Sequence, residues 1–523
     1  MSLSIEISQL FESETWSLPA SWSWEHISAV ADVIGGGTPK TTILSNFGSD
    51  VAWITPADMS HHNNIYISSG ARSLSISGYE NSSAQKMPAG SVLFSSRAPI
   101  GYVAIAADEL TTNQGFKSFS PRAGVNSKYI YYWLIFSKHF AEKLASGTTF
   151  LEVSGKNSAL IPFPVAPKKE QTRIVEKLDE LLSDLDNGVA ELKAAQTKLT
   201  QYRQSLLKSA VEGSLTSEWR KQNSVTETGE QLLQRILIER RQRWEQQKLA
   251  EFKEKGKTPP KDWQKKYPEP VKPDTSELPE LPDGWVWASL DMVGDIVSGV
   301  TKGTKRKISV EVFETSYLRV ANVQRGYLDL SEIKTIPATQ SDIEKYTLQK
   351  GDILFNEGGD RDKLGRGWVW YGEVENCIHQ NHVFRLRPYL DEVIPELISY
   401  YGNTFGKIWF QNAGKQTTNL ASINKGILQS FPVPLSPYAE QMETMDLLTT
   451  EIDKVDRQII AIDVSLKEID TQRKNILKDA FSGKLVKQDP SDEPASVLLD
   501  KIKAERLAQT KLPKPKRTKK KSQ

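Results

Sequence analysis

The sequence predicts an α+β protein in which two β-rich globular domains are separated by two long helices that pair as an antiparallel coiled coil. One observation is a repeat: the segment 203–216 (Arg-Gln-Ser-Leu-Leu-Lys-Ser-Ala-Val-Glu-Gly-Ser-Leu-Thr) returns at 473–486 (Arg-Lys-Asn-Ile-Leu-Lys-Asp-Ala-Phe-Ser-Gly-Lys-Leu-Val). The copies lie about 270 residues apart in a chain of 523 residues, which indicates an internal duplication. A second observation is that each copy ends a long helical pattern. We therefore expect a pseudo-twofold internal repeat.

The helical patterns have apolar residues at alternating steps of three and four. Heptads of this length are typical of a coiled coil, and the simplest partner for each helix is the other. Gly213 and Gly483 stand where a helix C-cap is expected. The apolar positions are Leu182, Leu185, Val189, Leu192, Leu199, Leu206 and Ala210 in the first copy, and Ile452, Val455, Ile459, Ile462, Leu466, Ile469, Ile476 and Ala480 in the second.

The duplication extends beyond the helices. Leu18-Pro-Ala-Ser-Trp-Ser-Trp24 resembles Leu281-Pro-Asp-Gly-Trp-Val-Trp287, and a Phe-Pro-Val segment precedes both Gln171 and Gln441. Each half therefore has the same order: a tryptophan motif, a globular part, a proline-rich exit and a long helix. The ends of the two halves match better than their globular middles.

Composition is that of an ordinary globular protein, with 25% charged and 38% hydrophobic residues. No apolar run approaches the roughly 18 residues that a membrane span needs, and the N-terminus lacks a signal-peptide pattern. A single cysteine, Cys377, excludes an internal disulfide, so we expect a reducing cytoplasm. The net charge of +2 is uninformative, although the segment 511–521 is strongly basic.

These patterns divide the chain into six parts. We expect a globular domain at 1–168, a central helical region at 169–256 and a proline-rich linker at 257–280. A second globular domain is expected at 281–435, a C-terminal helical region at 436–510 and a basic disordered tail at 511–523.

An aromatic cluster lies on a helix expected from Asn126 to Leu144. Tyr129, Tyr131, Tyr132 and Trp133 could stack on nucleic-acid bases. Aromatic residues at helical spacing more often belong to a core, which is the reading that we favour.

Enzyme motifs are weak throughout. We find no Asn-Pro-Pro-Tyr/Phe methyltransferase motif and no Gly-x-Gly-x-x-Gly after a strand. Gly35-Gly-Gly-Thr-Pro-Lys40 lacks phosphate-loop spacing, so a mobile loop is expected there. Cys377-Ile-His379-Gln-Asn-His382 resembles a metal motif, but no second cluster completes a tetrahedral set. The sequence predicts neither a catalytic residue, nor a cofactor, nor a metal.

Loops rich in Lys, Arg, Thr and Asn recur at matching places in both halves. Arg, Lys, Asn and Gln are the side chains that read base edges, while Ser, Thr and Lys hold phosphates. Any single loop is more often plain surface, but their joint recurrence favours DNA binding. The candidate DNA-binding residues are Thr38, Lys40, Arg97, Asn113, Lys117 and Thr148 in the first half, and Lys302, Lys305, Arg306, Asn356, Arg361, Lys363, His382 and Lys415 in the second.

The order of parts resembles the specificity subunit of a type I restriction–modification enzyme. The motifs that carry the resemblance are Phe163-Pro-Val-Ala-Pro with Gln171, its copy ending Ala439-Glu-Gln441, the two Arg…Gly-x-Leu helix ends, Thr216-Ser-Glu-Trp-Arg220, and Leu498-Leu-Asp-Lys-Ile-Lys-Ala-Glu-Arg506. The resemblance spans the whole chain. It implies two target-recognition domains, each reading half of a split sequence in double-stranded DNA.

The resemblance also implies partners. The helices would dock two methyltransferase subunits, and restriction (motor-nuclease) subunits would then join. The subunit itself would bind neither S-adenosylmethionine nor ATP, and it would act on DNA in a prokaryotic cytoplasm without a membrane. Because family members differ most in their globular middles, no base-contacting residue can be carried over.

The sequence leaves two other classes of protein open as alternatives. One is a methyltransferase fused to its own target domain, against which the missing catalytic motif argues. The other is a coiled-coil adaptor protein with two binding domains, which sequence-specific and salt-sensitive binding to one duplex would exclude.

Two expectations concern the helices. Arg203 and Arg473 occupy equivalent heptad positions that an apolar residue would normally fill. In an antiparallel pair Arg203 would approach Asp453 or Asp456, and Arg473 would approach Asp184 or Asp186; alternatively, both arginines lie just outside the seam. The seam from Leu182 to Ala210 would be about 42 Å long, near one turn of DNA, so the helices could set the gap between two half-sites.

Overall fold

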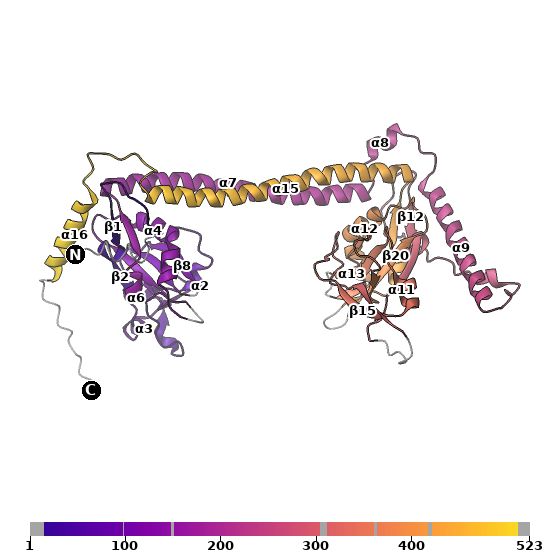
Figure 1. The fold of residues 1–523 in the computed structure, drawn as a ribbon, viewed down its shortest axis with the longest axis horizontal. Coiled ribbons are helices and arrows are strands. Elements are labelled where there is room, and N and C mark those ends of the chain that lie inside the picture. The colour runs from indigo at the N-terminus through magenta and orange to yellow at the C-terminus, as the bar shows by residue number, and fades with distance from the viewer. Residues whose placement is uncertain are drawn as a thin grey trace. The chain divides into compact units, whose positions relative to one another are not determined.

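The structure of the protein is a computed structural model, and it describes residues 15–97, 99–147, 151–303, 311–359, 363–416 and 421–510. The chain divides into two compact units: residues 1–194 with 462–523, and residues 195–461. Each unit contains one globular domain and parts of both long helices (Figure 1). The basic tail at 511–523 lies outside the described residues.

The first domain is built on a five-stranded sheet of order β2-β10-β7-β8-β5, with a four-stranded sheet of order β3-β6-β4-β9 and a separate pair, β1-β11. The strands are β1 Ser23–His26, β2 Ala31–Gly35, β3 Phe47–Gly48, β4 Val51–Ile54, β5 Tyr66–Ile67, β6 Arg72–Leu74, β7 Val92–Ser96, β8 Ile100–Ala106, β9 Thr111–Thr112, β10 Lys117–Pro121 and β11 Pro162–Val165. The helical segments are η1 Ile27–Ala29, η2 Leu44–Asn46, α2 Pro56–Met59, α3 Ile76–Glu80, α4 Ser127–Phe136, α5 Lys138–Leu144 and α6 Gly155–Ser158.

The aromatic cluster belongs to the core of this domain. Tyr129 and Trp133 are fully buried on α4, where the Tyr129 hydroxyl donates to the Pro164 carbonyl at 3.0 Å and the Trp133 indole donates to the Pro162 carbonyl at 2.8 Å. These bonds fasten α4 to β11. The core reading is therefore confirmed, and base stacking by Tyr129 and Trp133 is excluded by their burial.

The second domain has a related plan, with its described strands divided among three sheets and one separate pair. Its sheets have the orders β13-β20-β16-β18, β15-β14-β19 and β17-β22-β21, and β12-β23 forms a separate pair. The strands are β12 Val286–Ser289, β13 Gly294–Ser298, β14 Phe313–Leu318, β15 Lys334–Ala338, β16 Ile353–Asn356, β17 Gly358–Gly359, β18 Gly367–Val369, β19 Ile378–His379, β20 Val383–Pro388, β21 Lys415–Gln416, β22 Ala421–Ser422 and β23 Pro432–Leu435. The helices are α10 Leu290–Val293, α11 Gln340–Tyr346, α12 Pro395–Thr404, α13 Gly406–Ala413 and α14 Lys425–Ser430.

The two long helices are α7, Lys168–Val211, and α15, Tyr438–Phe481, each of 44 residues. In residues 195–461 the end of α7 packs on the start of α15 through Leu206, Ala210, Leu448, Ile452 and Val455. In the other unit the start of α7 (Leu182) shares a core with the end of α15 (Ala480). The helices are therefore antiparallel, and the predicted α+β fold with paired long helices is confirmed (Figure 1).

Both long helices end at a glycine, as the sequence predicts. Gly213 and Gly483 each have a φ of +73°, which is the left-handed conformation of a C-cap. A Cβ atom at Gly213 would lie 2.7 Å from Pro282 Cγ, and one at Gly483 would lie 2.4 Å from Pro19 Cγ. The repeated Leu-Pro motif therefore packs against the repeated helix end, which explains why both recur together.

The shorter helices of the central and C-terminal helical regions each cover one domain. Helix α9, Gly229–Glu254, buries Leu232, Leu233 and Ile236 on the second domain. Helix α16, Ala495–Thr510, buries Leu498, Leu499 and Ile502 on the first. After α7 and before α9 lies α8, Ser217–Gln222, and a short 3₁₀ turn, η3 Trp263–Lys266, interrupts the proline-rich linker. No helix in the described part of the chain has the length and apolar character to cross a membrane.

Candidate DNA interface

One edge of the first domain collects the candidate residues because of its strand order. Strand β10 runs antiparallel to both β2 and β7. The residues that follow β2 and β7 therefore meet the residues that precede β10, and Lys117 pairs directly with Gly35. Thr38, Arg97 and Lys117, which lie far apart in the sequence, come from these three strand ends.

Polar contacts join these side chains into one cluster. Lys117 Nζ lies 3.7 Å from Glu152 Oε1, and Arg97 Nη1 lies 3.2 Å from Glu152 Oε2. Lys117 also donates to the Gln114 carbonyl at 3.2 Å, and the Thr38 hydroxyl donates to the Gln114 side chain. We call Thr38, Arg97, Gln114, Lys117 and Glu152 the first edge cluster. Glu152 and Gln114 were missed by the sequence analysis, although Glu152 holds both cations.

The glycine-rich loop beside this cluster is tightly packed, which corrects the expectation of a mobile loop. A Cβ atom at Gly36 would lie 1.8 Å from the Asn113 carbonyl oxygen, and Trp53 donates its indole N–H to the Gly37 carbonyl at 2.9 Å. Asn113 shapes the facing turn, because its side-chain oxygen accepts from the Gly115 amide at 2.9 Å. Lys40 is exposed beyond this loop.

The second domain has an equivalent edge. Strand β20 runs antiparallel to β13 and β16, so the residues after Ser298 and Asn356 meet those before Val383. There His382 Nδ1 lies 2.5 Å from Glu357 Oε2. A Cβ atom at Gly299 would lie 1.9 Å from the His379 carbonyl oxygen, which matches the packing at Gly36. Lys302 is exposed on the loop that follows.

Asn356 differs from the other candidates because it is fully buried. Its amide donates to the carbonyls of Val320 and Val323 at 3.3 and 2.9 Å, so the side chain supports the loop from within and does not face solvent. Lys363 is half-buried, and the backbone of Lys415 pairs with Ser422. Thr148, Lys305, Arg306 and Arg361 lie outside the described residues.

The residues of the metal-like motif are separated by the fold. Cys377 and His379 are buried, whereas His382 is about half exposed. Burial raises the pKa of the Cys377 thiol to about 12 and lowers the pKa of His379 to about 4, while Val383 accepts a hydrogen bond from His379 Nδ1 at 2.7 Å. These features describe a core thiol and a neutral core imidazole.

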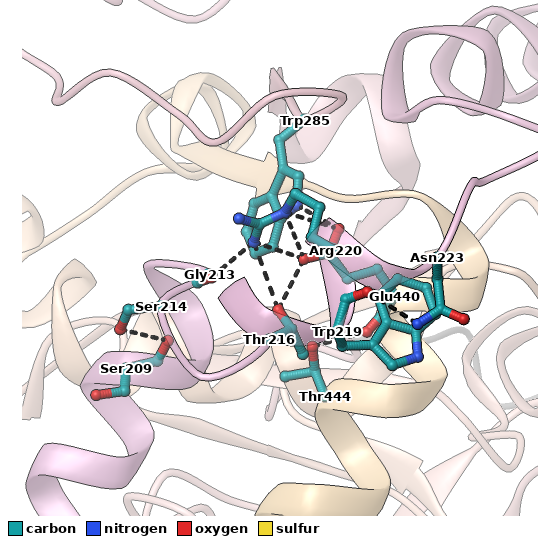
Figure 2. A network of polar contacts seen from close by, with 10 residues as sticks. All are labelled: Ser209, Gly213, Ser214, Thr216, Trp219, Arg220, Asn223, Trp285, Glu440 and Thr444. Carbon is teal, nitrogen blue, oxygen red and sulfur yellow. Dashed lines mark hydrogen bonds and ion pairs between the residues drawn. The ribbon is translucent and has the colours of Figure 1, made fainter.

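A second polar network fixes the second domain to the helices (Figure 2). Glu440, in the first turn of α15, is fully buried and accepts from the Trp285 indole at 2.9 Å and from the Thr216 hydroxyl at 2.7 Å. Arg220 of α8 lies 2.6 Å from Glu440 and donates to the Gly213 carbonyl at 2.6 Å. We call this network the Glu440 clasp. It links one domain, the start of α15 and the end of α7.

The first domain has the same clasp built around Glu170, in the first turn of α7. Trp22 donates its indole N–H to Glu170 at 2.9 Å. Gln488 takes the place of Arg220, because it donates both to Glu170 and, at 3.2 Å, to the Gly483 carbonyl. Burial raises the pKa of Glu170 above its usual range, and the hydrogen bonds from Trp22 and Gln488 and the nearby charge of Arg173 oppose that shift.

Two copies of one domain type account for this repeated architecture. The sequence matches the family described as "Type I restriction modification DNA specificity domain" over residues 19–194 and again over 282–462. The chain belongs to this family. It is a type I restriction–modification specificity subunit with two target-recognition domains, the non-catalytic component that recognises the DNA target within the restriction–modification complex.

Individual specificity subunits are similar in sequence to this chain. The specificity subunit of MjaIX from Methanocaldococcus jannaschii is 38% identical over 179 residues, which are 33% of this chain and 41% of that subunit. The EcoKI specificity subunit of Escherichia coli K12 is 24% identical over 379 residues, 70% of this chain and 68% of that subunit. The match to MjaIX therefore spans less than half of that relative.

Solved structures show the same fold. A chain from a structure concerned with complex assembly and conformational transition of the type I R-M system aligns with a TM-score of 0.61 and 17% identity, over 90% of this chain and 100% of that chain. The HsdS subunit from Thermoanaerobacter tengcongensis aligns with a TM-score of 0.51 and 17% identity, over the same shares.

Proposed function

We propose that this specificity subunit reads a bipartite DNA sequence, with one half-site for each target-recognition domain. The observation that carries the proposal is that equivalent strand ends gather polar and charged side chains in both domains. In the first edge these are Arg97, Lys117 and Glu152, and in the second they include His382 and Glu357. Because the side chains differ while the backbone arrangement repeats, the two half-sites should have different sequences.

The chemistry of the edges suits DNA. Arginine and glutamine present hydrogen-bonding groups that match base edges, and lysine and threonine hold phosphates. In the free protein Glu152 pairs with Arg97 and Lys117, which keeps both cations oriented toward one place. We propose that DNA phosphates and bases compete with Glu152 for these cations. Further contacts to the phosphate backbone of DNA would come from Thr38, Lys40, Lys302 and Lys363.

The proposal extends to partners. Two methyltransferase subunits would dock on the helical regions, and restriction subunits would join that assembly on DNA in a prokaryotic cytoplasm. The two clasps support this view, because each fixes one domain to the ends of both long helices. A subunit bound to the helices could therefore be held at a set position relative to the domain beside it.

Exchanging one domain tests the split reading. The segment from Ala31 to Ser158 would be replaced by its equivalent from a relative, leaving the β1-β11 pair in place, since Trp24 in β1 pairs with Pro164 in β11. With the methyltransferase partner present, mapping of methylated adenines should show one changed half-site and one unchanged half-site. The reciprocal exchange in the second domain is the control. A change in both half-sites after a single exchange would contradict independent reading.

A further inference from the structure

An open apolar pocket in the second unit has its counterpart filled in the first. The pocket has a volume of about 700 Å³, within the range of roughly 300–1,000 Å³ typical of ligand sites. Trp287, Tyr401, Phe405, Trp409 and Phe431 contribute its aromatic walls. Val211, at the end of α7, and the linker around Pro279 complete the lining.

In the first unit Trp16 occupies the equivalent space. Its ring packs edge-on against Trp24, Trp133 and Phe136, with centroid separations of 5.3, 6.4 and 6.0 Å. The Trp16 indole also donates to the Phe481 carbonyl at the end of α15, at 3.2 Å. An indole therefore fits this type of pocket and reaches the last carbonyls of the long helix.

The equivalence of the two positions rests on a repeated hydrogen bond. Trp24 donates its indole N–H to the carbonyl of Trp16 at 3.0 Å, and Trp287 donates to the carbonyl of Pro279 at 3.2 Å. In both cases the acceptor lies eight residues before the donor. Pro279 thus stands where the first unit has Trp16, and Val211 stands about 270 residues before Phe481 at the matching helix end.

The rim of the open pocket is acidic. Glu212, Asp274, Glu277 and Glu280 line it, and all four are exposed. Among the described residues that line the pocket there is no lysine or arginine. Such a rim attracts cations and repels nucleic acid, so the pocket does not suit DNA.

We propose that this pocket binds an indole side chain presented by a basic segment of a partner protein. The indole lies between Trp287, Tyr401 and Phe405, as Trp16 lies against its own aromatic neighbours, and its N–H donates to the Val211 carbonyl. Lysine or arginine residues beside it pair with Glu277 and Glu280. The inference concerns a protein contact and stands independently of how the domains read DNA.

Calorimetry with the full chain tests the pocket with three peptides. The probes are the acetylated and amidated pentapeptides KKWKK, KKAKK and EEWEE. We expect KKWKK to bind one site and the other two to bind at least tenfold more weakly. In Pro279→Trp the new indole should fill the pocket as Trp16 does, and KKWKK affinity should fall at least tenfold. Equal binding of KKAKK, of EEWEE, or of KKWKK to the variant would overturn the proposal.

A second variant tests the pocket independently of whether Pro279→Trp folds correctly. The double change Glu277→Lys and Glu280→Lys affects only exposed linker positions and should also lower KKWKK affinity, most strongly at low salt. The matched control is Glu254→Lys at the exposed end of α9, which should leave affinity unchanged. Sedimentation of the wild-type chain tests whether a second copy of this chain fills the pocket instead. If the wild-type chain associates with itself and Pro279→Trp abolishes that association, the occupant is a second copy and the proposal of a partner protein is refuted.

Discussion

Arg203 Nη1 on α7 lies 2.9 Å from Asp456 Oδ1 on α15. Arg473 on α15 forms the same contact with Asp186 on α7, and both partners are displaced by 270 residues. The predicted pairings, and with them the antiparallel orientation, are therefore confirmed. Of the two alternatives for these arginines, the position at the edge of the seam is the one found, since the side chains of Arg203 and Arg473 are 44% and 32% exposed. At the edge of the seam, water reduces the cost of each charge.

The first prediction follows from this exposed pair. Arg203→Asp should lower the free energy of unfolding by about 0.5–1 kcal/mol, because it places two carboxylates together in a solvated site. Adding Asp456→Arg should recover most of that loss, because the reversed pair can form with the same geometry. Thermal unfolding of the single and double variants measures both effects. If the double change gave no recovery, the two side chains would not be partners in solution.

The stability of the protein should respond in opposite ways when the glutamate of each clasp is replaced by neutral glutamine. Glu440→Gln leaves the Arg220 guanidinium without its carboxylate and should cost about 2–3 kcal/mol. Glu170→Gln should be neutral or stabilising at pH 7, because burial disfavours the charged form of Glu170 and this outweighs its hydrogen bonds and the charge of Arg173.

The pH dependence of the Glu170 clasp has a definite sign. Because the pKa of Glu170 is raised in the folded state, the folded protein binds its proton more tightly than the unfolded chain does. The contribution of Glu170 to the free energy of unfolding should then fall as pH rises from about 4.5 through the raised pKa, and the difference between the wild type and Glu170→Gln should show that fall. Melting curves between pH 4 and 8 provide the measurement. Subtracting the two curves removes the opposite contribution of His379, whose pKa burial lowers. The same pH dependence in the wild type and the variant would refute this role of Glu170.

The helix caps offer a prediction with an internal control. Gly213→Ala and Gly483→Ala each place a side chain at a φ of +73°, which costs about 1 kcal/mol, and each also drives a Cβ atom into a proline ring. At Gly256 the φ is +60°, and a Cβ atom there would have no neighbour within 4 Å. Gly256→Ala should therefore incur only the cost of the backbone conformation. The melting temperature should therefore fall further for the two caps than for Gly256→Ala. Equal losses would show that the packing against proline relaxes freely.

What the sequence predicted well was periodic or repeated. Heptad spacing is visible locally, and a glycine after a helical run indicates a C-cap, so Gly213 and Gly483 were located without a structure. The repeat of α9 in α16 was missed because a Leu-Leu-x-x-Ile pattern occurs in many helices. Only the structure shows that Leu232 and Leu498 are each buried in the core of one domain.

The edge residues were predicted less well because burial and long-range pairing decide their roles. The sequence predicted Asn356 as a DNA-binding residue. In the structure it ends a central strand, and its side-chain amide donates hydrogen bonds to the backbone carbonyls of Val320 and Val323 within the core. Glu152 looked like an ordinary acidic residue, yet it pairs with two cations from distant strands. Neither fact follows from composition or spacing, because each depends on which strands become neighbours.

Replacement of the edge cations should separate base reading from phosphate binding. Arg97→Ala should cost about 1–3 kcal/mol of specific binding and relax one position of the target, and we expect the same of Arg361→Ala in the second half. Lys117→Ala should weaken binding to all sequences alike and reduce the salt dependence by about one phosphate contact. Titrations with specific and unrelated duplexes at several salt concentrations measure both effects. Unchanged affinity and methylation pattern in both arginine variants would refute their assignment as readers.

The last prediction concerns the length of the long helices. Each has 44 residues and is therefore about 66 Å long, enough to include the roughly 34–36 Å of one DNA turn. We propose that this length sets the number of unread base pairs between the half-sites. Adding seven residues to both helices keeps the heptad frame and lengthens each helix by about 10 Å, or about three base pairs.

Such an insertion should move the methylated sites in a defined way. The half-sites should stay the same while the gap grows, with some loss of activity because three base pairs also rotate the second site by about 100° around the duplex. An insertion of four residues is the control, since it breaks the period of the seam and should be more damaging. Mapping of methylated adenines for both variants decides the matter. An active seven-residue variant that kept the original gap would show that something other than helix length sets the spacing.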